Sequence, residues 1–68
     1  MGYSLEIEQE DDGRWIADVP EIPGVLVYAG SRNEAIARAQ ALSLRVLAER
    51  LENGEQLPEI DGVFRIIA

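Results

Sequence analysis

The segment at residues 20–24, Pro-Glu-Ile-Pro-Gly, constrains the fold more than any other part of the chain. Each proline fixes its φ angle and removes a backbone N–H donor, so these residues cannot extend a β-sheet. Pro23 and Gly24 suit the central positions of a type II turn, in which glycine supplies the positive φ. The sequence therefore predicts two strands joined by a stiff loop, and such a loop loses little entropy when it binds a partner.

The alternation of apolar and polar residues on both sides of this loop predicts the strands. Residues 3–8 alternate strictly, which is typical of a half-buried strand. A turn at residues 10–13 leads into a second strand at residues 14–19, so the two strands form an antiparallel hairpin. Residues 25–29 are apolar on both faces and predict a third strand that is buried on both sides.

After this third strand, the spacing of apolar residues changes from every second residue, as in a strand, to about 3.6 residues, as in a helix. Ser31 and Glu34 form the signature of a capping box, and apolar residues at helical spacing predict a helix from about Ser31 to Asn53. Gly54 is placed to end it. Residues 62–68, apolar on both faces, predict a last strand. The predicted fold is a single α+β domain with two layers, order β-β-β-α-β, in which one helix covers one face of a mainly antiparallel four-stranded sheet.

Composition narrows the classes of function. The chain has 68 residues with no cysteine, histidine or lysine, which excludes disulfides and the usual zinc sites. Thirteen acidic and six basic residues give a net charge of −7, which disfavours direct binding to nucleic acid and favours a basic protein partner. No apolar run is long enough to span a membrane, and the start lacks the features of a secretory signal. We expect a cytoplasmic protein without a cofactor.

Carboxylates are the main groups available for chemistry. Five of them cluster on the first hairpin, and Asp18 lies near the end of the second strand; the five are Glu6, Glu8, Glu10, Asp11 and Asp12. Their spacing does not match a calcium-binding loop. None of the serines has an identifiable base partner, so an enzyme is not expected. A small acidic domain that binds a metal ion or resembles a nuclease is kept as an alternative.

The order of strand, P-x-x-P-G loop, strand and helix, the last beginning Gly30-Ser31-Arg32-Asn33-Glu34-Ala35, resembles the N-terminal domain of HicB-type antitoxins. The resemblance covers the whole chain and implies part of a ribonuclease H-like fold. Members of this family neutralise a small basic toxin of the HicA type, which cleaves messenger RNA. Full-length members usually carry a C-terminal DNA-binding domain, whereas this chain stops at Ala68. It also has Val25 where members often have a cysteine or similar small residue.

The resemblance and the loop together predict a partner-binding site on this chain. It consists of Asp18, Pro20, Glu21, Ile22, Pro23 and Gly24, with Ile22 as the apolar anchor.

One helix can cover only one face of a sheet that is apolar on both faces. The sequence therefore predicts a homodimer or a larger homo-oligomer that buries the other face. The residues expected in its interface are Val25, Val27, Tyr28, Phe64 and Ile66. A homo-oligomeric domain of some other function is the remaining alternative.

Overall fold

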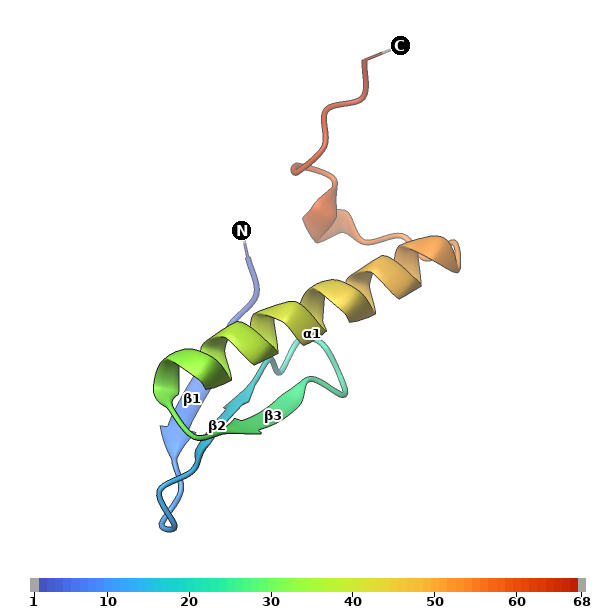
Figure 1. The fold of residues 1–68 in the computed structure, drawn as a ribbon. Helices are drawn as coiled ribbons and strands as arrows, with labels where there is room; N and C mark the ends of the chain where they lie inside the picture. The colour runs from blue at the N-terminus through green and yellow to red at the C-terminus, as the bar shows by residue number, and fades with distance from the viewer. Residues whose placement is uncertain (1, 68) are drawn as a thin grey trace.

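The computed structural model describes residues 2–67, which form a three-stranded sheet and one long helix (Figure 1). The strands β1 (Glu6–Gln9), β2 (Trp15–Asp18) and β3 (Leu26–Ala29) are antiparallel and lie in the order β1-β2-β3. Helix α1 (Arg32–Glu52) crosses one face, and a short 3-10 helix, η1 (Pro58–Ile60), follows it. The α+β class is confirmed. Within these residues, α1 is not apolar enough to be a membrane span, and no other helix qualifies.

The strand register assigns each side chain to one face of the sheet. Ile7, Ala17 and Val27 pair across the three strands and face α1. The neighbouring rows belong to the opposite face, since side chains alternate along a strand. One row is Glu6, Asp18 and Leu26, and the other is Glu8, Ile16 and Tyr28.

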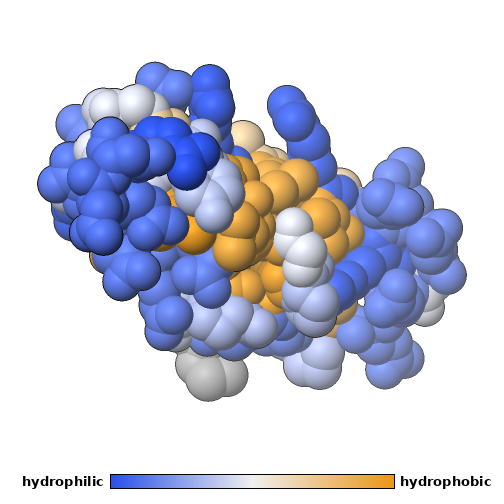
Figure 2. All heavy atoms as spheres, turned by 90° about the horizontal axis from the view of Figure 1, so that it is seen from below, coloured by the Kyte–Doolittle hydropathy of each residue, from blue (hydrophilic) through white to orange (hydrophobic). Residues whose placement is uncertain are grey.

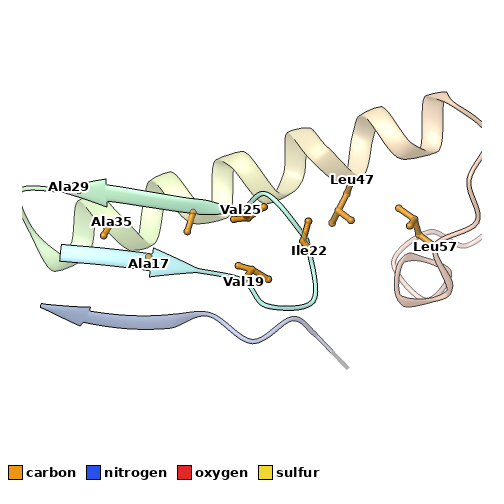
Figure 3. Packing of buried hydrophobic residues seen from close by; sticks show 9 residues of the cluster. Ala17, Val19, Ile22, Val25, Ala29, Ala35, Leu47 and Leu57 are labelled. Atoms are coloured by element: carbon orange, nitrogen blue, oxygen red, sulfur yellow. The ribbon is translucent and has the colours of Figure 1, made fainter. Parts of the chain in front are cut away.

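The core lies between α1 and the sheet and continues under the loop at residues 20–24, which we call the proline loop (Figure 3). Three alanines, Ala17, Ala35 and Ala39, are completely buried, which lets the helix approach the sheet closely. Farther along α1, the larger side chains of Ile22 and Leu47 lie between the helix and the loop (Figure 3). The buried hydrophobic residues are Ala17, Val19, Ile22, Val25, Ala29, Ala35, Ala39, Leu47 and Leu57.

The predicted ends of the helix are confirmed. Ser31 is the N-cap, and its Oγ accepts a hydrogen bond from the Glu34 backbone N–H at 3.2 Å. The Glu34 carboxylate does not complete the capping box but pairs with Arg38 at 2.8 Å. At the other end, Gly54 has φ +85°, and the N–H of Glu55 donates to the Arg50 carbonyl, as in a Schellman motif.

The predicted fourth strand at residues 62–68 is wrong for the residues described. Residues 63–67 form no strand and extend away from the sheet (Figure 1), while residue 68 lies outside the described residues. The Cα radius of gyration is 14.1 Å, compared with about 11 Å expected for a compact chain of this length. A strand needs a hydrogen-bonding neighbour, and this segment has none within the single chain that the structure describes.

Candidate protein-binding surface

Two consecutive turns build the loop between β2 and β3. The Ile22 N–H donates to the Val19 carbonyl at 2.9 Å, and the Val25 N–H donates to the Ile22 carbonyl at 3.2 Å. Each turn has a proline at its second position, where φ near −65° is required. Gly24 has φ +91°, as a type II turn demands. The Val19 N–H donates to the Val25 carbonyl and closes the loop, so three backbone hydrogen bonds and two prolines restrain it.

The prediction that Ile22 is the apolar anchor of the partner-binding site is wrong. Its side chain is 1% exposed and points toward α1 and Leu47 (Figure 3). The two turns direct the Ile22 side chain inward, so that the loop covers the end of the core. The exposed residues of the loop are Pro20, Glu21, Pro23 and Gly24, and Asp18 before it is half-buried.

Two of the residues expected at an oligomer interface also belong to the core side. Val25 is 3% exposed, and Val27 is half-buried against the core, so neither can lie in an interface on the opposite face. The expectation that residues 25–29 are buried on both sides is wrong for the single chain, because Leu26 and Tyr28 are 52% and 41% exposed. Tyr28, Phe64 and Ile66 remain exposed.

Glu21 ties the loop to the N-terminal segment. Both of its carboxylate oxygens accept the Ser4 backbone N–H, at 3.1 Å. Hydrogen bonding from the Ser4 side chain, and from the backbone N–H groups of Glu21 and Ser4, lowers the pKa of Glu21. Glu21 therefore has a structural role in the free chain, in addition to the partner-binding role predicted for it.

The lowered pKa of Glu21 predicts a pH dependence of stability. Because the pKa is lower in the folded chain than in the unfolded one, the contribution of Glu21 to stability is present above the unfolded pKa, about 4.5, and is lost as the pH falls through the folded pKa. The Glu21→Gln variant should lose less stability than the wild type between about pH 5 and pH 3. Denaturant unfolding at a series of pH values measures this. Equal acid-side slopes would contradict it.

The most distinctive surface is the face of the sheet that α1 leaves uncovered. We call it the outer sheet face, and its residues are Glu6, Glu8, Ile16, Asp18, Leu26 and Tyr28. The acidic residues lie on β1 and at the end of β2, whereas the large exposed apolar and aromatic side chains lie on β3. Seen from below, the molecule presents hydrophobic residues in a central area between hydrophilic ends (Figure 2).

The acidic half of the outer sheet face is slightly hollow. A shallow depression is lined by the three carboxylate residues Glu6, Glu8 and Asp18, with Ile16 among them. In the other half, the Arg14 guanidinium lies over the Tyr28 ring, 4.7 Å from its centroid, and pairs with Asp12 at 2.8 Å. This cation–π contact orients Tyr28. The face thus offers negative charge beside an aromatic platform.

Sequence reasoning placed Asp18 and Tyr28 in candidate sites but did not connect them. Side chains alternate along β2, so Ile16 and Asp18 lie on the face opposite Ala17. The sequence did not show the register between the strands. Because Ala17 pairs with Ile7 and Val27, Glu6, Glu8 and Leu26 lie on the same face as Ile16 and Asp18.

The carboxylates of the hairpin lie apart from one another. In the part of the chain that the structure describes, no three carboxylate side chains are close enough to hold a metal ion. Asp11 and Asp12 lie at the tip of the hairpin, and Arg14 lowers the pKa of Asp12 through hydrogen bonds from its backbone N–H and its guanidinium.

Because Glu6, Glu8, Glu10, Asp11 and Asp12 lie on one hairpin without partners from other elements, we predict that they support no magnesium- or manganese-dependent cleavage of RNA or DNA. A nuclease assay with either metal tests this. Cleavage that disappears in the Asp11→Asn, Asp12→Asn double variant would contradict the expectation.

No known protein family, curated protein or solved structure matches the chain. The resemblance to HicB-type antitoxins therefore stays a prediction.

Proposed function

We propose that this chain is a protein-binding module of the antitoxin type, which neutralises a small basic toxin by covering it with the outer sheet face. The observation that carries the proposal is the uncovered face itself, where Leu26 and Tyr28 lie exposed beside three carboxylates. The toxin class, an mRNA-cleaving protein of the HicA type, comes from the resemblance in the loop and the helix start.

The apolar half of the face has the composition of an interface centre. Tyrosine is enriched among residues that dominate binding energy, and Tyr28 has a preferred orientation because Arg14 lies over its ring. Leu26 is 52% exposed on the same edge strand. An aromatic side chain held in place loses little conformational entropy when a partner covers it.

The acidic half selects a basic partner. Glu6, Glu8 and Asp18 surround Ile16 in the shallow depression, so a lysine or arginine of the partner could lie among three negative charges. The net charge of −7 extends this field over the whole molecule and speeds encounter with a positively charged protein. An RNA-cleaving toxin needs basic residues to hold its substrate, and an acidic partner can mask them.

The proline loop contributes to the proposed binding site at the border of the outer sheet face. Asp18 belongs both to the outer sheet face and to the start of the loop, which continues through the exposed Pro20 and Glu21. Ile22 supports the loop from inside. The partner-binding site proposed is thus the outer sheet face with the exposed part of the loop at its border.

Binding to a small lysine-rich protein encoded beside this chain tests the proposal. Calorimetry at low and moderate salt should give a complex that weakens as salt rises, because charge pairs contribute. Substituting Tyr28→Ala should raise the dissociation constant by at least about 30-fold if it is a central residue. The charge reversals Glu6→Lys and Asp18→Lys should slow association.

Ala41→Glu serves as the control variant, since Ala41 is exposed on α1 and does not belong to the outer sheet face. It should bind the basic protein as the wild type does. Binding that is unchanged by Tyr28→Ala and by both charge reversals would remove the outer sheet face from the interface.

A further inference from the structure

β3 is an edge strand whose free side carries backbone hydrogen-bonding groups. In the sheet that residues 2–67 form, β3 pairs with β2 alone. The Val19 N–H donates to the Val25 carbonyl, and these two residues continue the register of the β2–β3 pairs. Because hydrogen-bonded and non-hydrogen-bonded pairs alternate along an antiparallel ladder, the N–H and C=O groups of Leu26 and Tyr28 point away from β2. A further strand can pair with groups of this kind.

The side chains of β3 do little to keep another strand away. Its sequence, Leu-Val-Tyr-Ala, carries no charge, whereas the other edge strand, β1, carries Glu6 and Glu8. Charged side chains on an edge strand are a common means of preventing it from pairing with other chains. Valine and tyrosine also favour β-structure, so β3 suits a paired strand well. Protection of this edge therefore has to come from another element.

Arg38 of α1 places a positive charge at this edge. Its Nη1 donates to the Tyr28 carbonyl at 3.1 Å, and its Nη2 pairs with Oε1 of Glu34, one helical turn earlier, at 2.8 Å. Neighbouring strands lie about 4.8 Å apart, so a guanidinium in contact with this carbonyl occupies the space that a further strand would take. The pair with Glu34 restrains the guanidinium in that position.

The same contact opposes pairing between the β3 strands of two copies. If these strands paired about a two-fold axis at Val27, Leu26 of each copy would lie opposite Tyr28 of the other. Each Tyr28 carbonyl would then have to accept the Leu26 N–H of the other copy. Arg38 already donates to this carbonyl in each copy. Pairing would therefore have to displace two guanidinium groups, with the loss of their hydrogen bonds.

We propose that Arg38 blocks the β3 edge: its guanidinium binds the Tyr28 carbonyl and so prevents a second copy from adding its own β3 to the sheet. The proposal concerns the edge of β3 and not the outer sheet face, so it does not depend on the proposed toxin partner. Any homo-oligomer of the wild type should leave this edge unpaired.

The Arg38→Ala variant should associate through β3. Sedimentation should show a larger species than for the wild type at the same micromolar concentration. In this variant, hydrogen exchange at the Leu26 and Tyr28 amides should slow by at least about tenfold as the protein concentration rises, because pairing protects them. In the wild type, exchange at these two amides should not depend on concentration.

Arg45→Ala is the matched control, because it removes the same charge from another exposed position of α1. It should keep the solution state and the exchange rates of the wild type. Adding Leu26→Lys to Arg38→Ala should restore the wild-type state, because a lysine on an edge strand opposes pairing. Alanine is favourable in a helix and Arg38 is exposed, so α1 should persist in each variant, which far-ultraviolet circular dichroism verifies.

An Arg38→Ala variant with the solution state and exchange rates of the wild type would overturn the proposal. So would a wild type in which protection of the Leu26 and Tyr28 amides grows with concentration, since β3 would then pair despite Arg38. Equal association of Arg45→Ala would make net charge the cause instead of the contact with Tyr28. Association that persists after Leu26→Lys is added would place the contact between copies away from β3, which also overturns the proposal.

Discussion

The Ile22→Ala variant should lose about 2–5 kcal/mol of folding free energy, the range for truncating a large buried aliphatic side chain. Ile22 is the largest side chain that is almost completely buried, and it joins the loop to α1 near Leu47. A domain of this size buries only about 60% of its unfolded surface, so a loss of that magnitude takes up much of its total stability.

Urea unfolding followed by circular dichroism measures this loss, with Leu26→Ala as the control. Leu26 is an aliphatic residue two positions after the same loop but 52% exposed, so its truncation should change the free energy of unfolding by no more than about 0.5 kcal/mol. If Ile22→Ala left stability unchanged and abolished partner binding instead, Ile22 would be an interface anchor and its position in the core would be wrong.

The Ala39→Leu variant should lose about 1–3 kcal/mol, for the opposite reason. Ala39, Ala35 and Ala17 are completely buried between α1 and the sheet, so an isobutyl group at position 39 must push the helix away or distort its neighbours. Overpacking of this kind separates the two layers that make up the whole domain.

Thermal and urea unfolding test this with Ala37→Leu as the matched substitution. Ala37 lies on the same helix but is exposed, and alanine and leucine have similar helix propensities, so its variant should stay within about 0.5 kcal/mol of the wild type. Equal effects at positions 37 and 39 would contradict the close packing of α1 on the sheet.

Local chemistry made the helix and the loop predictable. Ser31, with Glu34 three residues later, determines where α1 begins, and Asn53-Gly54 supplies the left-handed residue that ends it. Pro23-Gly24 similarly determines the turn before β3. Each of these features depends on residues within one or two turns of chain, so the sequence contains all the information they need.

The site was harder to predict because it depends on contacts between distant residues. That Ile22 faces inward depends on where α1 lies above the loop, and the sequence motif does not specify this. The outer sheet face depends on the register between three strands, which brings Glu6 and Leu26 to either side of Asp18. The fourth strand depends on a free edge, and the single chain does not bring residues 63–67 to one.

The proposed outer sheet face also explains why the acidic residues of the hairpin have different roles. Glu6 and Glu8 face the shallow depression with Asp18, whereas Asp12 neutralises Arg14 at the turn. Arg14 in turn lies over Tyr28, so the hairpin tip holds the aromatic residue of β3 in place. Charge and aromatic surface are therefore organised by the same hairpin.

An NMR titration of the isotope-labelled chain with a basic, toxin-like partner tests the central claim most directly. We expect the largest changes in amide chemical shift at Glu6, Glu8, Ile16, Asp18, Leu26 and Tyr28. Smaller changes are expected at Val19 and Glu21, which flank Pro20. The exposed side of α1 around Leu44 should change little. Changes confined to α1 or to residues 63–67, or a titration without any change, would contradict the assignment of the outer sheet face as the binding surface.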